Sequence, residues 1–248
     1  MIMASDFSLD KIFYEQLNEE MTSLGYKYVR KNKMFMKVSN DIIVKYVYLK
    51  TFSKINSKVS RFMIEGNLRS LYADSFIRND LLVESMSNSR YNDIVHGPDN
   101  GYPKYYECGY EEADKTVRQA FADSKEGIIR EIENVNSFEK YIRYCQKYNH
   151  GQISCATKYW KDSLALIVAN DHVDMKERLN ETIKTYEDNQ HIDYIEKVYP
   201  LLYRSFVELV AGERDKVYND PVLYKEALEE AERRKEANTL VLKDLKLI

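Results

Sequence analysis

The first hydrophobic pattern along the chain has the period of an amphipathic helix. Between residues 9 and 24 apolar side chains recur at steps of three and four, while Asp10, Glu15 and Glu19 fall on other faces. Ser8 is placed to cap the first turn, and Gly25 suits the left-handed position just after the last one. The sequence therefore predicts a helix from about residue 9 to residue 24.

After Gly25 the period of the pattern changes from helical to two. Four runs rich in β-branched and aromatic residues predict strands at 26–30, 34–38, 42–50 and 61–68. The polar connections between the first three runs are too short to hold a crossover helix, so these strands should pair as an antiparallel meander. A longer loop, 51–60, leads to the fourth run.

Helical periods dominate from residue 70 onward. The predicted helices span 71–86, 111–124, 126–135, a segment that begins after Ser137, 154–169, 173–188 and 192–211, the last of them kinked at Pro200. A final helix starts at Pro221, with Asp220 as its cap. Turn residues concentrate in 87–109, which predicts an irregular loop or linker there.

Together these elements predict an α+β fold. An N-terminal helix and a four-stranded antiparallel sheet are followed by a mostly helical C-terminal region. The predicted sheet domain covers residues 1–105 and the helical region covers residues 106–248. The pattern leaves open whether the two regions share one core.

The composition is that of a globular protein: of 248 residues, 44% are apolar and 31% are charged. No run reaches the roughly 18 consecutive apolar residues of a membrane-spanning helix, and the start of the chain does not have the pattern of a signal peptide. Cys108, Cys145 and Cys155 are odd in number and match no disulfide scaffold or metal site. We therefore expect a cytoplasmic protein with no membrane partner.

The net charge of −3 is unevenly distributed along the chain. Between Tyr26 and Leu71 there are eleven basic residues and two acidic ones, so this part carries +9 and the remainder −12. A charge separation on this scale shapes the electrostatic field of a protein and its choice of partners.

The familiar catalytic and cofactor signatures are absent from the sequence, among them the phosphate-binding loop, the dinucleotide fingerprint and the nucleophile elbow. We therefore predict no cofactor and no metal. Of four histidines, His96 lies in the predicted irregular segment, where functional residues tend to gather, and it is the loop candidate. Cys155 and His150 have the residue types of a thiol nucleophile and its base, although a small buried cysteine explains Cys155 better.

Tyrosine is unusually frequent, with 21 residues that include a group from Tyr102 to Tyr110. Tyrosines stack on bases or anchor interfaces, and they also pack in ordinary sheets and helices. The sequence favours the packing role.

The most specific functional signal is a basic face on the predicted sheet. If Tyr28, Met34 and Met36 point toward the core, alternation along the strands places their neighbours on the opposite face. The predicted anion- or partner-binding residues of that face are Lys27, Lys33, Phe35, Lys37, Lys45 and Arg61. The cations would hold phosphates, and the phenylalanine would be a stacking platform. Exposed lysines also protect strands from edge pairing, and acidic helices elsewhere in the chain could cover the patch.

The N-terminal residues resemble a known family. A helix that ends at Leu24-Gly25-Tyr26, a hairpin over 28–35 and a strand over 42–49 are similar to the uncharacterised bacterial family called domain of unknown function 4304. The resemblance covers about the first 70 residues. It implies a bacterial or phage α+β protein and carries over no catalytic residue, because none is assigned in that family. The glutamine-rich third strand expected of the family is missing here.

Two functions are compatible with these observations. The favoured one is a non-enzymatic interaction protein that binds an unidentified protein partner through charged surfaces, such as a bacterial or phage accessory, immunity or inhibitor protein. The alternative is an enzyme or binder of a phosphorylated or nucleotide ligand that uses the basic sheet, with His96 or the tyrosines of 102–110 facing that ligand. Direct nucleic-acid binding is disfavoured, because the pI of the whole chain is about 5.9.

Overall fold

The computed structural model describes residues 8–40, 43–52, 59–71, 86–137, 140, 144 and 221–248. The chain divides into two compact units. The first contains Met1–Leu68, Ser85–Asn136 and Leu245–Ile248, and the second contains Arg69–Glu84 and Ser137–Asp244. These bounds differ from the predicted boundary at residue 105, because helices as far as Asn136 contribute core side chains to the sheet.

The first helix, α1, spans Leu9–Ser23 and confirms the predicted helix. The Ser8 side chain accepts a hydrogen bond from the backbone N–H of Lys11 at 3.4 Å, which caps the first turn. Gly25 adopts φ +84° just after the helix, a conformation that glycine reaches without steric penalty. The buried stripe of the helix comprises Leu9, Phe13, Leu17 and Met21.

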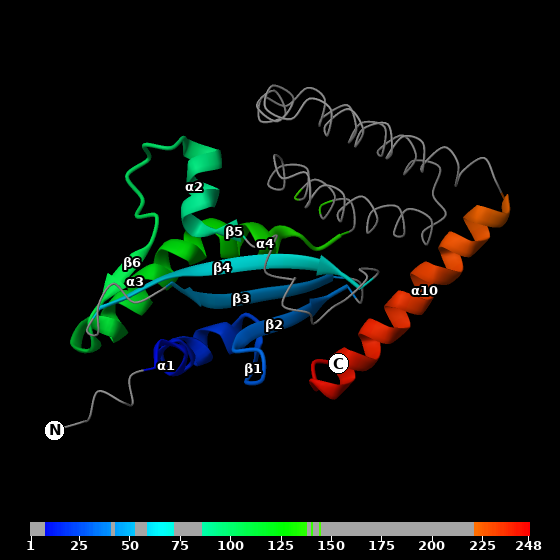
Figure 1. Cartoon of the computed structure of the whole chain (residues 1–248), viewed down its shortest axis with the longest axis horizontal. Coiled ribbons are helices and arrows are strands. Elements are labelled where there is room, and N and C mark those ends of the chain that lie inside the picture. The colour runs from blue at the N-terminus through cyan, green and yellow to red at the C-terminus, as the bar shows by residue number, and fades with distance from the viewer. Residues whose placement is uncertain are drawn as a thin grey trace. The chain divides into compact units, whose positions relative to one another are not determined.

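Six strands form one sheet in the described part of the chain, five of them in the order β1-β2-β3-β4-β5. They are β1 (Lys27–Val29), β2 (Met34–Ser39), β3 (Ile43–Thr51), β4 (Ser60–Ser70), β5 (Met86–Ser87) and β6 (Tyr106–Cys108). The first three pair antiparallel as predicted, and β5 and β6 both pair antiparallel with β4 (Figure 1). The α+β fold is confirmed, and two short strands extend the expected four-stranded sheet.

A series of helical segments follows β5. They are α2 (Asn88–His96), the 3-10 turn η3 (Tyr110–Glu112), α3 (Ala113–Ser124), the π-helical segment η4 (Lys125–Ile129), α4 (Arg130–Asn134) and α10 (Pro221–Asp244). The predicted helices at 111–124 and 126–135 and the helix start at Pro221 are confirmed. The prediction that 87–109 is irregular throughout is wrong, because the Ser87 side chain accepts a hydrogen bond from the backbone N–H of Arg90 and caps α2.

The other predicted helices cannot be compared with the structure. Those at 71–86, 154–169, 173–188 and 192–211, and the segment that begins after Ser137, lie wholly or almost wholly outside the described residues. Asp220, the predicted cap of the last helix, also lies outside them.

One face of the sheet is covered by α1 and by the consecutive helical segments α3, η4 and α4, which are kinked at Gly127 (Figure 1). Phe13 of α1 meets Phe35 of β2 with ring centroids 5.4 Å apart. At the other end of this face, a Cβ added to Gly66 of β4 would lie 3.2 Å from Ile128 and 3.3 Å from Ile132. The core of the first unit therefore lies between the sheet and these helices.

In the second unit the described residues include the end of β4, Leu71 and the helix α10. The side-chain amide of Asn238 donates a hydrogen bond to the carbonyl oxygen of Leu71 at 2.7 Å, and this amide and Leu242 are both buried. Within the described residues, every helix is too short or too polar to cross a lipid bilayer.

Candidate functional site

The predicted basic face is not free, because α1 and α4 cover the face of the sheet that Phe35, Lys37 and Lys45 share. Val29 pairs with Met34 across the turn 30–33, so Tyr28 lies opposite Phe35. Opposite residues of an antiparallel pair share a face, and α1 covers the face that these two rings occupy. Phe35 is 0% exposed, so it has no free ring face for a ligand.

Lys37 and Lys45 lie opposite each other on β2 and β3, and both contact Glu133 of α4. Lys37 Nζ donates to Glu133 Oε2 and to the carbonyl oxygen of Leu24, each at 2.7 Å. Lys45, which is 2% exposed, donates to the carbonyl oxygen of Glu133 at 3.0 Å, and the Tyr26 hydroxyl donates to Oε1 at 2.7 Å. These two lysines are therefore interior groups that join α1, the sheet and α4.

The electrostatics of Glu133 follow from this cluster. Burial alone would raise the pKa of the carboxyl group, but hydrogen bonds from Lys37 and Tyr26 and the charges of Lys45 and Lys37 outweigh that effect and lower the pKa. The glutamate is therefore ionised at neutral pH and compensates part of the charge of the two lysines. It was missed in the sequence because nothing in the local pattern of 130–134 links it to the strands.

The remaining predicted cations, Lys27, Lys33 and Arg61, also have acceptors within the protein. These acceptors are the carbonyl oxygen of Lys246 at 2.7 Å, the carboxylate of Asp10 at 2.6 Å and the carboxylate of Glu107 at 2.7 Å, respectively. A phosphate would have to displace an internal partner from each cation. Anion binding by these residues stays a prediction, without a common surface to support it.

A buried carboxylate lies on the opposite face of the sheet from Phe35. Glu65 is 3% exposed; the Tyr48 hydroxyl donates to its Oε2, and Lys50 Nζ lies 3.1 Å from its Oε1. Both carboxylate oxygens thus already accept hydrogen bonds. This is the arrangement of a structural ion pair, and it offers no lone carboxylate for general base catalysis.

The histidine and thiol candidates show no catalytic arrangement in the described part of the chain. His96 is the exposed last residue of α2, and no hydrogen bond or ion pair joins its side chain to another described residue. Cys108 is buried, and burial together with the charge of Glu112 raises the pKa of its thiol, which disfavours the reactive thiolate. Cys145, Cys155 and His150 lie outside the described residues.

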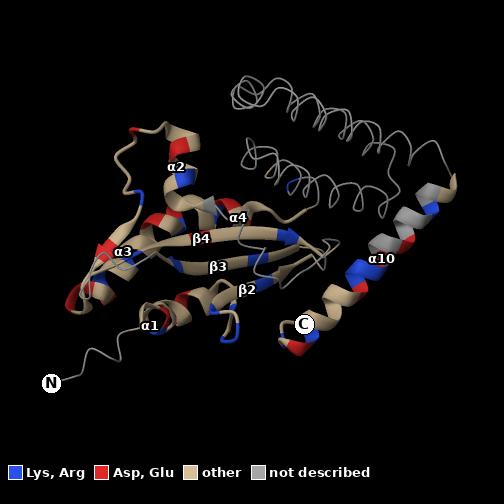
Figure 2. Ribbon diagram, viewed as in Figure 1, with Lys and Arg blue, Asp and Glu red and all other residues tan. Residues whose placement is uncertain are grey.

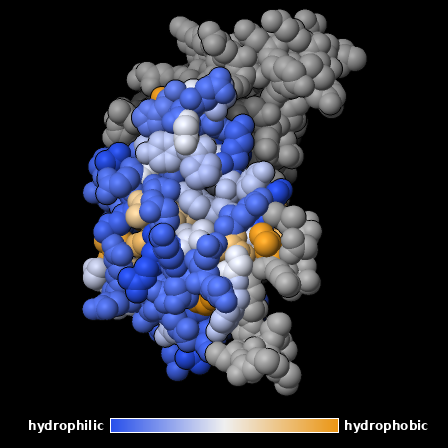
Figure 3. All heavy atoms as spheres, turned by 90° about the vertical axis from the view of Figure 1, so that its left-hand side faces the viewer, coloured by the Kyte–Doolittle hydropathy of each residue, from blue (hydrophilic) through white to orange (hydrophobic). Residues whose placement is uncertain are grey.

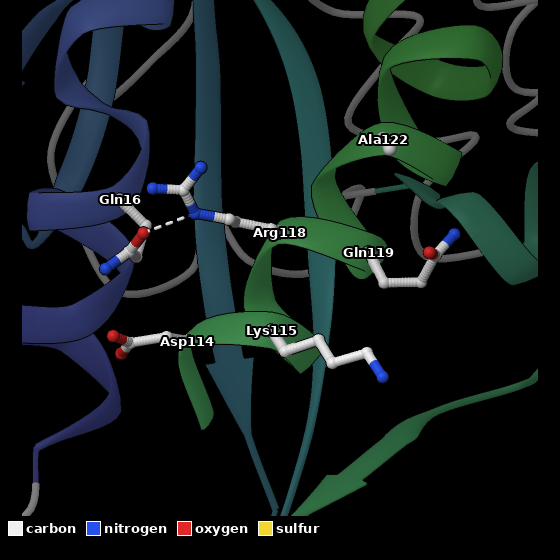
Figure 4. Close-up of a pocket in the computed structure, with 6 residues that line it drawn as sticks. All are labelled: Gln16, Asp114, Lys115, Arg118, Gln119 and Ala122. Atoms are coloured by element: carbon white, nitrogen blue, oxygen red, sulfur yellow. Dashed lines mark hydrogen bonds between the residues drawn. The ribbon is translucent and has the colours of Figure 1, made fainter. Parts of the chain in front are cut away.

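No group of three or more histidine, cysteine, aspartate or glutamate side chains in the described ranges is arranged to hold a metal ion. A pocket of about 510 Å³ lies beside α1 and α3 (Figure 4). Its lining residues are Gln16, Asp114, Lys115, Arg118, Gln119 and Ala122. Arg118 Nε donates to Gln16 Oε1 at 2.5 Å, while Lys115 and Gln119 point away from this pair. Every lining residue is at least partly exposed and both charges are present, so the pocket selects no ligand class.

Exposed apolar side chains concentrate around the segment between α2 and α3. Of eight large exposed hydrophobic residues in the described part of the chain, five lie between residues 94 and 110. We call these five residues the tyrosine surface: Ile94, Val95, Tyr102, Tyr105 and Tyr110. The three tyrosines are 44%, 41% and 55% exposed, in that order. Figure 3 shows this side of the molecule, which is hydrophilic over most of its area with small hydrophobic spots.

Local polar contacts position the loop that carries the first two tyrosines. Asn100 Oδ1 accepts a hydrogen bond from the backbone N–H of Tyr102 at 2.9 Å, and its Nδ2 lies 3.5 Å from Asp93 Oδ1 on α2. Gly97 and Gly101 adopt φ +90° and +80°, which other residues rarely reach, and let the chain turn after α2. The rings are therefore displayed from a loop held at both of its ends, by α2 and by β6.

Carboxylates surround the tyrosine surface. Residues 93–114 contain six acidic residues and one basic residue, a net charge of −5. Figure 2 shows acidic residues on α2, on the loop after it and around β6 and α3. The sequence contains this signal as a charge count beside the tyrosine group at 102–110, but the search for a basic face passed over it.

No protein-family model, curated protein or solved structure matches this chain. The resemblance of the N-terminal residues to an uncharacterised bacterial family therefore stays a prediction.

Proposed function

We propose that this chain is a non-enzymatic interaction protein that binds a partner protein through the tyrosine surface. The supporting observation is that five of the eight large exposed hydrophobic residues among those described lie within one segment, 94–110. Exposed apolar clusters with a polar surround are typical of protein–protein contacts, and tyrosine is among the residues that contribute most to binding at such contacts.

The charge around the surface supports the same proposal. The net −5 of residues 93–114 would steer a basic partner toward the tyrosines and disfavour an acidic one. Tyrosine loses little conformational freedom when it is buried at an interface, because its side chain has two rotatable bonds. An accessory, immunity or inhibitor protein would use such a surface to engage its target.

The alternative function, binding of a phosphorylated or nucleotide ligand on the basic sheet, has less support. Phe35 and Lys45 are buried under the helices, and Lys37 is engaged by Glu133. An anion there would have to compete with internal carboxylates that are already hydrogen-bonded.

The interaction function is tested by photo-crosslinking in an extract of the source cells. A photoreactive phenylalanine analogue replaces Tyr102 in the full-length protein, and a matched variant carries it at Glu126, whose side chain is 75% exposed. We expect one discrete crosslinked protein with the analogue at position 102 and none at position 126. Excess wild-type protein should abolish the crosslink.

Specificity is checked with a charge-reversed competitor, Asp99→Lys combined with Glu111→Lys, both of which change exposed residues. This competitor should fail to suppress the crosslink. The proposal is overturned if no crosslink forms at position 102, if position 126 gives the same product, or if the competitor suppresses the crosslink as well as the wild-type protein does.

A further inference from the structure

Within the tyrosine surface, the chain holds one of its own arginines in a defined way. The guanidinium carbon of Arg61 lies 3.9 Å from the centroid of the Tyr105 ring. Glu107 Oε1 accepts hydrogen bonds from Arg61 Nε at 2.9 Å and from its Nη2 at 2.7 Å. The planar cation is thus stacked on a tyrosine and hydrogen-bonded to a carboxylate. With 34% of the Arg61 side chain exposed, the arrangement forms at the surface of the protein.

A second exposed tyrosine is linked to a carboxylate a few residues earlier in the loop, through its backbone and the side chain of Asn100. Tyr102 is 44% exposed, and Asn100 ties its backbone to the carboxylate of Asp93. Lys104 Nζ lies 4.0 Å from Asp93 Oδ2, at the outer limit of an ion pair, and 66% of the lysine side chain is exposed. A pair of this length at the surface contributes little, so a better-placed cation can replace the lysine.

Charge and geometry together favour arginine as the incoming group. The net −5 of residues 93–114 attracts a basic segment and repels nucleic acid. A guanidinium stacks its flat face on a tyrosine ring while its N–H groups reach a carboxylate in the same plane. The ammonium group of lysine is a compact, strongly hydrated point charge that gains less from the ring.

We propose that the partner of the tyrosine surface contributes a basic segment whose arginine stacks on Tyr102 and donates hydrogen bonds to Asp93 or Asp99. This inference rests on the proposed interaction function and names the chemistry of the partner. The chain's own Arg61, seated on Tyr105 and Glu107, is the internal example of that contact.

The test uses two fluorescein-labelled peptides of eight residues, one of alternating arginine and glycine and one of alternating lysine and glycine. Fluorescence anisotropy gives their affinity for the full-length protein at low and at physiological salt. We expect the arginine peptide to bind about three- to fivefold more tightly than the lysine peptide, the gain of a cation–π contact at an exposed site.

Three variants locate the contact. Tyr102→Ala should reduce the affinity for the arginine peptide to that for the lysine peptide, whereas Tyr102→Phe should keep the preference because the ring remains. Asp93→Asn should weaken the binding of both peptides. The control Glu126→Gln removes one exposed carboxylate outside the surface and should leave the arginine preference unchanged.

Equal binding of the two peptides, no binding of either, or a preference unaffected by Tyr102→Ala would overturn the arginine inference. Tight binding of a twelve-residue thymidine oligonucleotide would overturn it as well, in favour of nucleic acid. If the crosslink at position 102 forms while the arginine preference is absent, the interaction function stands and the inference fails. If the crosslink is absent, the interaction function itself fails, whatever the peptides do.

Discussion

Phe35 packs without exposed surface against Phe13 of α1 and Tyr28 of β1, at ring-centroid distances of 5.4 and 5.0 Å. We expect Phe35→Ala to lower the free energy of unfolding by about 3–5 kcal/mol, because it opens a cavity in a packed core. Urea denaturation measures this loss. The comparison is Lys31→Ala at an exposed turn position, which should change stability by less than about 0.5 kcal/mol. If the two substitutions lowered the free energy of unfolding equally, Phe35 would lie on an exposed face, as the sequence predicted.

Residue-scale predictions succeeded where the cause was local. Ser8 caps α1 and Gly25 follows it with a positive φ, as the residue types alone predict. Phe35 and Lys45 share one face of the sheet, as alternation along the strands predicts, but that face is covered and not exposed. Alternation shows which residues share a face, whereas the packing of helices distant in the sequence decides which face is buried.

At the scale of elements, the junction of α3 and α4 is constrained by one glycine. Gly127 has non-helical dihedral angles of φ −102° and ψ −108° inside η4, and a Cβ there would lie 1.9 Å from Oδ1 of the buried Asn88. We expect Gly127→Ala to destabilise the protein by about 1–3 kcal/mol through overpacking. In an ordinary helix interior the same change stabilises by up to about 1 kcal/mol, so the sign of the effect is diagnostic.

Gly66→Ala is the matched control for that prediction. Its Cβ would lie 3.2 Å from Ile128, a contact that small adjustments relieve, so thermal unfolding should show a smaller loss than for Gly127→Ala. A stabilised Gly127→Ala protein would show that the contact between α2 and η4 is absent.

The long elements were predictable and the short ones were not. The alternating runs gave β1 to β4, and the periods of three and four gave α1, α3 and the start of α10. The strands β5 and β6 have two and three residues and, unlike the equally short β1, they do not lie within a longer alternating run. The helix α2 was not predicted, because it is short and the glycine- and proline-containing segment after His96 indicated a loop.

At the scale of the whole molecule, Glu133 joins the end of α1, the sheet and α4 of the first unit. Because its pKa is lowered in the folded state, the ionised carboxylate stabilises the fold at neutral pH, and this contribution is lost as the pH falls through the lowered pKa. We expect Glu133→Gln to lower the free energy of unfolding by about 1–3 kcal/mol at pH 7. The difference from wild type should shrink at pH 3.

Chemical denaturation at both pH values checks this expectation. Glu126→Gln, which affects an exposed pair with Arg130 at 3.5 Å, should differ little from wild type at either pH. If Glu133→Gln lowered the free energy of unfolding equally at pH 7 and pH 3, its effect would come from altered packing or hydrogen bonding and not from the lost charge.

The sequence contains the separation of charge along the chain as a count of residues, but it does not show which of these charges are paired within the fold. Four of the five predicted cations contact carboxylates within the first unit: Lys33, Lys37, Lys45 and Arg61. In the acidic segment 93–114, Glu107 and Asp93 also have cationic partners, whereas Asp99 and Glu111 are exposed beside the tyrosines. A charge is neutralised by residues that are often far apart from it in the sequence. Composition therefore does not show which charges remain exposed.

The segment η4, with its kink at Gly127, determines which side chains of α4 face the sheet. A residue removed from Lys125–Ile129 would alter the kink at Gly127 and turn the side chains of α4 by about 100° about the helix axis. The packing of Ile132 against Gly66 would then be lost, as would the contacts of Glu133 with Lys37 and Lys45. A single-residue deletion here should therefore be tolerated far less well than one in the exposed loop after α2, and variation in chain length within this fold should accumulate in that loop.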